Sequence, residues 1–296
     1  CRVPDRGARI LCDYLATLGF IAKTGERYAL TTDTAMFLSK KSPAYLGGTA
    51  EFLYSSELTA FMQRLTSTVR DGVGASSMVD AENPQWVRFA RALPPMIMPS
   101  AQAIAGILGA AGAGPIRVLD IAAGHGMFGI VIAQHNPKAE IVAVDWAPVL
   151  QVATENAKAM GVGDRHRTLP GDAFTVDYGT GFDVVLVTNF LHHFDWPANV
   201  AFLKKTAAAL RKGGKVVVLE FVPNEDRLSP PMAARFSLAM LAFTPGGGAY
   251  TLKELRAADM RVCSHDLTDK QQELIDAFES KAIDHTATAK QLYSLQ

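Results

Sequence analysis

The chain has 296 residues, of which 49% are hydrophobic, and its 29 basic and 29 acidic residues leave no formal net charge. A chain of this length can bury one sizeable core and a smaller one, so we expect two domains. A neutral chain lacks the attraction to phosphates that nucleic-acid binding requires, so we expect no nucleic-acid partner. No apolar stretch reaches about 18 residues and no signal peptide is visible, which argues against a membrane protein.

The three cysteines, Cys1, Cys12 and Cys263, form no CxxC pair. An odd number of scattered cysteines argues against a disulfide framework and favours a reducing, cytoplasmic compartment. Cysteines and histidines show no metal-ligand spacing, so we predict no metal site. Because the chain opens with Cys1 instead of Met, we expect the natural protein to extend further toward its N-terminus.

The first third of the chain is predicted to be mainly helical. Residues 6–20 carry apolar side chains at helical spacing, and FIAKTGERYALT (20–31) has the pattern of a hairpin. A helix followed by a hairpin of this size predicts a winged-helix module. Residues 43–70 again have a helical pattern, which ends at Gly72 and Gly74. Residues 86–110 are predicted to be helical with interruptions at Pro94, Pro95 and Pro99.

From residue 115 the sequence changes to near-continuous apolar runs: IRVLDI (116–121), EIVAVD (140–145), FDVVLVTNF (182–190) and GKVVVLEFV (214–222). Such runs are typical of strands in a parallel sheet that is covered on both faces. Helical segments alternate with them, near 127–135, 147–160 and 197–211. This alternation predicts a doubly wound α/β sheet, whose ligands bind beyond the carboxyl ends of the strands.

A glycine-rich turn and two further acidic residues follow these strands. The first strand runs into Asp120-Ile-Ala-Ala-Gly124-His-Gly126, and the second ends in Asp145, where a carboxylate can accept hydrogen bonds from ribose hydroxyls. Asp172 is followed by two apolar residues, a pattern suited to an adenine ring. A dinucleotide fingerprint requires G-x-G-x-x-G at a helix start that faces a pyrophosphate. An acidic residue at the front of the turn would repel that group and suits a ligand with an ammonium and a sulfonium.

The motifs VLDIAAGHG, VAVDW, GDAF and FDVVLVTNFLHHF, in this order, resemble those of the class I methyltransferases. The similarity covers roughly residues 6–256 and is closest to the O-methyltransferases that include plant phenolic and bacterial natural-product enzymes. It implies a Rossmann-like, doubly wound, mostly parallel sheet with a smaller, mainly helical winged-helix N-terminal domain. It also implies S-adenosyl-L-methionine as cofactor, S-adenosyl-L-homocysteine as product, and a homodimer formed by the N-terminal module.

The resemblance divides the chain into a winged-helix-like dimerisation domain (1–85), a helical linker and pocket wall (86–114), a methyltransferase domain (115–262) and an unassigned helical tail (263–296). The cofactor-binding residues that it implies are Asp120, Ala122, Gly124, Gly126, Asp145, Trp146, Gly171, Asp172, Ala173, Phe174 and Asn189. The family ends in two antiparallel strands, whereas only MRVCSHDL (260–267) near the end of this chain has a strand pattern.

Two histidines are candidates for the catalytic base. A hydroxyl is a poor nucleophile until it loses its proton, and histidine is the usual general base near neutral pH. The plant enzymes carry a histidine after the fourth strand, and counting back from FLKK (202–205) assigns this role to His192, with His193 as the alternative. The family has an acidic residue after its histidine, where this chain has His193, so Asp195 or a distant acidic residue would have to orient the base. His125 is expected to cover the cofactor.

Two segments that the family folds over its acceptor are rich in aromatic residues and methionine, which suit a flat apolar ligand. The predicted acceptor residues are Trp86, Phe89, Met96, Met98, Phe236, Met240 and Phe243. We therefore predict methylation of a hydroxyl on a small apolar or aromatic molecule. A C- or N-methyltransferase, a winged-helix DNA-binding regulator and a cofactor-binding protein without catalysis are the alternatives.

Overall fold

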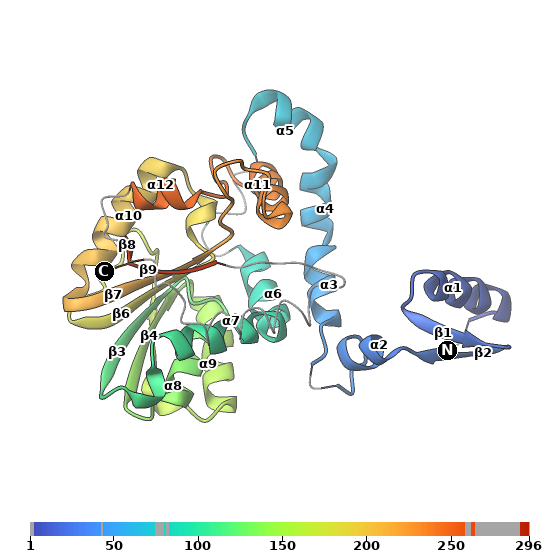
Figure 1. Cartoon of the computed structure of the whole chain (residues 1–296), viewed down its shortest axis with the longest axis horizontal. Helices are drawn as coiled ribbons and strands as arrows, with labels where there is room; N and C mark the ends of the chain where they lie inside the picture. Colours follow the sequence, from blue (N-terminus) through green and yellow to red (C-terminus); the bar gives the residue numbers. More distant parts are fainter. Residues whose placement is uncertain are drawn as a thin grey trace. The chain divides into compact units, whose positions relative to one another are not determined.

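The structure, a computed structural model, describes residues 3–42, 44–74, 80, 83–257, 262–263 and 291–295. Its internal contacts divide the chain into two units, Cys1–Tyr54 and Ser55–Gln296. The predicted domain boundary at residue 85 therefore lies inside the second unit. Figure 1 shows the elements of both units.

The described residues of the first unit form three helices and one hairpin. Its elements are α1 (Asp5–Thr17), β1 (Ile21–Thr24), β2 (Arg27–Leu30), α2 (Thr32–Phe37) and α3 (Gly47–Leu53). The Asp13 carboxylate ties α1 to the hairpin, because Oδ1 accepts hydrogen bonds from Lys23 Nζ at 2.6 Å and from the Tyr28 hydroxyl at 2.7 Å. The predicted helix and hairpin are confirmed, and their identity as a winged-helix module stays a prediction.

The second unit opens with four helices, α4 (Ser56–Gln63), α5 (Leu65–Asp71), α6 (Pro84–Ala92) and α7 (Pro94–Ile107). The predicted break at Gly72 is present, with a left-handed φ of 71°. Pro94 and Pro95 open α7, where a missing N–H costs no intrahelical bond. The predicted interruption at Pro99 is wrong, because α7 continues through it. Its buried face packs against the rest of the unit and outweighs the poor helix propensity of proline.

A seven-stranded sheet forms the centre of the second unit. Its strands are β3 (Ile116–Ile121), β4 (Ala139–Asp145), β5 (His166–Pro170), β6 (Phe182–Thr188), β7 (Leu210–Glu220), β8 (Val262–Cys263) and β9 (Gln291–Leu295). The order is β5-β4-β3-β6-β7-β9-β8, with parallel pairing from β5 to β7 and antiparallel pairing of β9 with both its neighbours. The predicted doubly wound, mostly parallel sheet is confirmed.

Helices cover both faces of this sheet. α8 (Met127–His135) and α9 (Ala147–Ala159) pack on one face, and α10 (Trp196–Ala208) packs on the other (Figure 1). Right-handed crossovers produce this arrangement, because the chain reverses direction across the sheet after β5. The remaining elements are α11 (Pro231–Phe243), α12 (Leu252–Arg256) and the short turns η2 (Ala110–Gly112), η3 (Gly163–Arg165) and η4 (Leu191–His193).

The prediction of a helical tail is wrong at its end. Gln291–Leu295 is strand β9, which pairs with β7 and completes the sheet. Val262–Cys263 forms β8, within the predicted strand at 260–267, whereas the helical pattern at 264–290 lies outside the described residues. β7 also begins at Leu210, before the predicted strand start at residue 214. Among the residues described, no helix has the length and apolar character needed to cross a membrane.

Two helical glycines give a matched test of this packing. A Cβ added to Gly129 in α8 would lie 2.6 Å from Ile141 Cγ2 and 3.1 Å from Asp120 Oδ2, whereas one added to Gly106 in α7 would meet nothing within 4 Å. We expect Gly129→Ala to lower the free energy of unfolding by about 1–3 kcal/mol through overpacking. Gly106→Ala should raise it by about 0.5–1 kcal/mol through better helix propensity. Urea unfolding curves measure both, and equal effects would contradict the direct packing of α8 on the sheet.

Candidate active site

The strand order reverses between β3 and β6, and the loops after these two central strands diverge at the carboxyl edge of the sheet. Ligands of doubly wound sheets bind at such a switch point. The backbone is strained on both sides of it, because Ala122, directly after β3, and Asn189, directly after β6, each have a φ of 53°. Left-handed conformations are unfavourable for residues other than glycine and cluster at functional sites.

The turn after β3 depends on two glycines. Gly124 and Gly126 have φ values of 56° and 75°, and Gly126 caps the start of α8. A Cβ at Gly126 would lie 3.0 Å from Ala153 Cβ and 3.1 Å from Ile130 Cδ1, so α8 and α9 leave no room for a side chain there. The turn therefore presents backbone, with few side chains, to the edge of the sheet.

The Asp145 carboxylate connects the ends of β3 and β4. Its Oδ2 accepts a hydrogen bond from Gly124 N at 2.8 Å, and its Oδ1 accepts one from Trp146 N at 2.7 Å. Burial raises the pKa of Asp145 to about 6, although these two hydrogen bonds oppose the rise. Each carboxylate oxygen has a second lone pair, so the group can still accept hydrogen bonds from a ligand.

Asp120 is completely buried at the end of β3. Its Oδ2 accepts a hydrogen bond from Gly129 N in α8 at 3.1 Å, and its Oδ1 has no hydrogen-bond partner among the described residues. Burial raises the pKa of Asp120 to about 7, and the nearby charge of Asp145 adds to the rise. The carboxyl group thus supports the glycine turn from the protein interior, and its predicted contact with the cofactor stays a prediction.

Asp172 organises the turn after β5. Its Oδ1 accepts a hydrogen bond from Phe174 N at 2.8 Å, and its carbonyl accepts bonds from the amides of Thr175 and Val176. Gly171 has a φ of 154°, and a Cβ there would lie 3.0 Å from Val176. The turn is therefore tightly closed, with the half-buried Asp172 carboxylate at its start.

The structure shows the surroundings of Phe174 and Asn189, which the sequence does not determine. The Phe174 ring packs with Phe190, Phe194 and Phe202 at centroid distances of 4.8–6.1 Å, in the hydrophobic core. Asn189 N donates to Leu219 O at 2.7 Å, while its Oδ1 is buried and has no partner among the described residues. Phe174 is thus at least partly a core residue.

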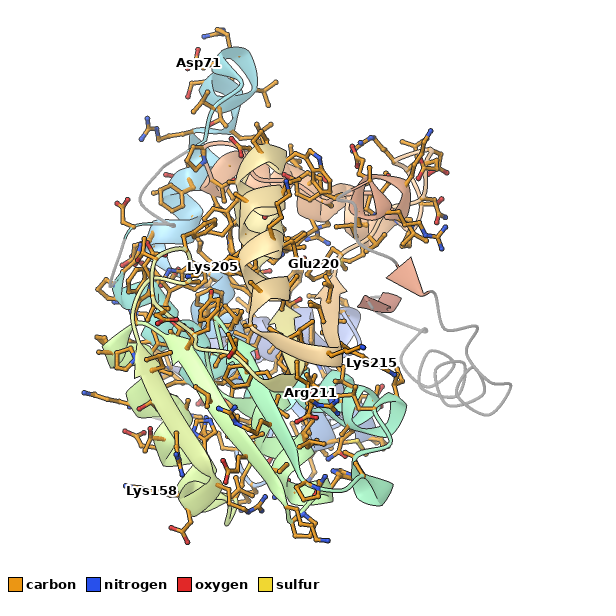
Figure 2. All side chains as sticks on the ribbon, turned by 90° about the vertical axis from the view of Figure 1, so that its left-hand side faces the viewer. Asp71, Lys158, Lys205, Arg211, Lys215 and Glu220 are labelled. Atoms are coloured by element: carbon orange, nitrogen blue, oxygen red, sulfur yellow. The ribbon has the colours of Figure 1, made fainter. Side chains whose placement is uncertain are left out.

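The structure adds a buried contact between His192 and Glu220. His192 in η4 is 4% exposed, and Glu220 is 5% exposed. Figure 2 labels Glu220, which ends β7. His192 Nδ1 lies 2.6 Å from Glu220 Oε2. Glu220 Oε1 accepts hydrogen bonds from the amides of Phe190 at 2.8 Å and Leu191 at 2.7 Å. One buried carboxylate therefore fixes both the turn and the orientation of the imidazole that it carries.

Of the two sources considered for this carboxylate, the distant residue is correct and Asp195 is not. Asp195 caps α10 by accepting a hydrogen bond from Ala198 N at 2.9 Å. Glu220 ends the run VVVLE, and an acidic residue that closes an otherwise apolar strand is the signal that could have identified it.

The loop 244–248 packs directly on the backbone of the histidine turn. Gly248 N donates to His192 O at 3.0 Å. A Cβ at Gly247 would collide with His192 O and would lie 2.9 Å from the carbonyl carbon of His193. This glycine therefore permits the close approach that holds the turn from the side opposite β7.

His193 lies in an apolar environment next to His192. The two imidazole centroids are 4.2 Å apart, and the Trp86 ring stands edge-on to His193 at 5.2 Å. Burial, together with the neighbouring His192, holds the pKa of His193 well below its usual range. These surroundings therefore favour the neutral form of the His193 imidazole.

A continuous series of ring contacts links the histidine pair to the glycine turn. On one side, Phe236 contacts His192 at 4.7 Å and stacks on Phe221 at 3.8 Å. On the other side, Trp86 contacts Phe89 at 5.8 Å, and Phe89 lies parallel to His125 at 6.1 Å. Three of the predicted acceptor residues, Trp86, Phe89 and Phe236, therefore line one aromatic region.

The other predicted acceptor residues lie elsewhere or are buried. Met96 is 43% exposed, whereas Ile97 takes the inward position on α7, and the predicted contact of Met96 with the acceptor stays a prediction. Met98 is half-buried, Met240 is buried, and Phe243 packs against Phe61 of α4 at 5.7 Å. Within the described part of the chain, no three His, Cys, Asp or Glu side chains group in a way that could hold a metal ion.

The carboxylates at the sheet edge suit a nucleoside that carries positive charge. Carboxylates follow β4 and β5, and a third is buried beneath the glycine turn. The Phe89 ring lies 3.7 Å from the position that a Gly124 Cβ would occupy, so the turn is covered by an apolar surface. A pyrophosphate would face this negative charge unfavourably, whereas an adenosyl sulfonium would not.

Comparisons with known proteins agree with this geometry. Residues 118–214 match the methyltransferase domain family. A Nostoc punctiforme protein of known crystal structure, assigned as an O-methyltransferase, is 43% identical in sequence to this chain. The two structures match with a TM-score of 0.86, over 100% of this chain and 85% of that one. The 3-hydroxy-5-methyl-1-naphthoate 3-O-methyltransferase of Streptomyces sahachiroi is 26% identical over 88% of this chain and 78% of its own. The L-tyrosine C(3)-methyltransferase of Streptomyces lavendulae is 30% identical over 46% of this chain and 37% of its own.

The fold and the site define a class I methyltransferase. More narrowly, the chain belongs to the O-methyltransferase family, and it is an enzyme whose cofactor is S-adenosyl-L-methionine.

The raised pKa of Asp120 predicts how the stability of the ligand-free protein depends on pH. The folded chain retains a proton up to about pH 7 that the unfolded chain releases near the ordinary pKa of 3.8. The stabilising contribution of this proton is complete below that lower value and is lost as the pH rises to about 7. Asp120→Asn cannot ionise, so the variant should gain up to about 4 kcal/mol relative to wild type between pH 4 and pH 8. Urea unfolding at several pH values measures this gain, and parallel pH profiles would contradict it.

Proposed function

We propose that this enzyme methylates a hydroxyl group of a small aromatic molecule and that His192 removes the proton of that hydroxyl. The observation that carries the proposal is the His192–Glu220 pair at the carboxyl edge of the sheet. The imidazole is one short turn away from β6, next to the switch point where the cofactor is expected. The aromatic region between His192 and His125 supports a flat acceptor.

Glu220 supports a defined tautomer of the base. When Nδ1 carries the proton and donates it to Glu220 Oε2, Nε2 keeps a lone pair that can accept the proton of the acceptor hydroxyl. The two amides that bind Glu220 Oε1 prevent the carboxylate from turning away. His193 is a weaker candidate for the base, because its buried ring resists protonation.

The cofactor, when bound, supplies an electrophilic methyl group on a sulfonium, so no further activation of the leaving group is required. Asp145 would accept hydrogen bonds from the ribose hydroxyls, with Trp146 beside it, and Asp172 and Ala173 would contact the adenine. The turn Ala122–Gly126 would line the methionine portion, and Asn189 would lie near the transferred methyl. The main contribution of the chain is to align the acceptor and exclude water.

Variants of the histidine pair test this proposal in an assay with methyl-labelled S-adenosylmethionine and a panel of phenols, polyketides and hydroxylated alicyclic compounds. His192→Ala should lower kcat at least about a hundredfold, because the general base is lost. Glu220→Gln should cause a loss of similar size, since an amide N–H facing Nδ1 stabilises the tautomer that cannot accept the proton. Both variants should bind S-adenosylhomocysteine as the wild type does.

Asp195→Asn is the matched control, because asparagine caps a helix as well as aspartate does and Asp195 does not contact His192. Its kcat should stay within about twofold of wild type, well below the contribution of a general base. An unchanged kcat in His192→Ala would exclude His192 as the base. Label on carbon or nitrogen of the product, located by NMR, would favour the alternative acceptor atoms.

We further propose that the first unit forms a homodimer and does not bind nucleic acid. α1 has no buried residue, and the large apolar side chains Ile10, Leu11 and Tyr14, together with Leu18 at its C-cap, are 47–60% exposed. Exposed apolar surface of this kind on one helix favours a protein partner. The balance of 29 basic and 29 acidic residues disfavours duplex DNA.

Leu11→Glu should dissociate this dimer, because a charge would be buried in an apolar interface. Arg27→Glu introduces the same carboxylate at an exposed position of β2, outside α1, and should leave the dimer intact. Sedimentation velocity at several protein concentrations measures both variants. A monomeric wild type, or a salt-sensitive gel shift with duplex DNA, would contradict the proposal.

A further inference from the structure

The turn expected to contact adenine, residues 171–176, is held from behind by a side chain of α10. Lys205 Nζ donates hydrogen bonds to Ala173 O at 2.8 Å and to Val176 O at 2.7 Å (Figure 2). A single ammonium therefore bridges two carbonyls of the same turn. Hydrogen bonds from a charged donor are stronger than those between neutral groups, and two of them restrict the rotation of the peptides that they join.

Tyr178 completes this arrangement. Its hydroxyl donates a short hydrogen bond to Ala173 O, and its ring lies beneath the ammonium, with Lys205 Nζ 4.1 Å from the ring centroid. Burial raises the pKa of Tyr178, so its hydroxyl stays protonated and keeps donating. Ala173 O thus accepts from two side chains, and the aromatic ring stabilises the cation that provides one of the bonds.

The same contacts constrain Asp172. Oδ1 of this carboxylate accepts from Phe174 N, whereas no described residue forms a hydrogen bond to Oδ2. The orientation of Oδ2 then depends on the backbone from Asp172 to Val176, which is the segment that Lys205 fixes. The ammonium also attracts the carboxylates of Asp172 and Asp177, which opposes the lowering of its own pKa by burial.

We propose that Lys205 and Tyr178 are positioning residues that hold the turn 171–176 in the conformation that recognises the amino group of adenine. The inference rests on the proposed role of Asp172. Neither side chain needs to touch the cofactor, because each acts through the carbonyl of Ala173. Selectivity for adenine over a purine with a carbonyl at position 6 would then depend on α10 as well as on the turn itself.

Binding of S-adenosylhomocysteine and of S-inosylhomocysteine, in which a carbonyl replaces the amino group, tests this inference by calorimetry. The wild type should prefer the adenine compound by at least about tenfold. Lys205→Met keeps the aliphatic stem and removes the donors, so it should weaken S-adenosylhomocysteine about tenfold and leave the inosine compound unchanged. Tyr178→Phe should narrow the preference about threefold, and Lys204→Met, at the exposed neighbouring position, should not change it.

A merely structural role for Lys205 would weaken both compounds equally, and that result, or an unchanged preference in both variants, would overturn the inference. Tyr178→Phe removes a single oxygen atom, so it provides an independent test if Lys205→Met does not fold. If the wild type bound S-adenosylhomocysteine and S-inosylhomocysteine with equal affinity, the inference would also be overturned, whereas the proposed function would stand. A wild type that binds neither compound would overturn the proposed function itself.

Discussion

The carboxylate of Glu220 is the constraint on which the histidine site depends. It ends a buried strand, yet it has three hydrogen-bond partners: two amides of the turn after β6 and the imidazole of His192. A buried carboxylate without partners would be strongly destabilising, so the strand, the turn and the imidazole must adopt their positions together. The neighbouring loop adds a second restraint, because Gly247 leaves no space between itself and the His192 carbonyl.

On the other side of the switch point, a second carboxylate also links the end of one strand to the turn after another. Asp145 joins the end of β4 to the glycine turn after β3, as Glu220 joins β7 to the turn after β6. Each of these turns begins with a non-glycine residue in the left-handed region, Ala122 and Asn189. The carboxyl edge of the sheet therefore contains both of these carboxylates and both of these strained residues. Such concentration is typical of functional sites.

The sequence was sufficient to predict the doubly wound sheet, because a strand such as IRVLDI that is buried on both faces has no polar alternation. It was also sufficient for the carboxylates at the ends of β4 and β5. It did not predict the partner of His192, because Glu220 is 28 residues away and only the parallel pairing of β6 with β7 brings them together. The effect of Pro99 was misjudged because packing of α7 overrides the poor helix propensity of proline.

The short strand β9 is a second case in which a long-range contact, and not the local sequence pattern, determines the conformation. Gln291–Leu295 pairs with β7 although the residues before it have a helical pattern, because pairing with a neighbouring strand, which is a long-range contact, determines its conformation. Local pattern is reliable where a segment satisfies its own hydrogen bonds, as in α8 and α9, and becomes unreliable where the partner is distant in sequence.

Asp120 shows why the acidic residues of this edge need a functional explanation. An asparagine could accept the same hydrogen bond from Gly129 N without the cost of a buried charge. The carboxyl group is instead destabilised by burial and by repulsion from Asp145, which raises its pKa to about 7. A cationic ligand at this edge reverses that balance, because it favours the ionised form of both carboxylates. The ligand-free protein is thus less stable near neutral pH than it would be with an uncharged side chain at this position, and a cationic cofactor bound at this edge, as proposed, would offset this deficit.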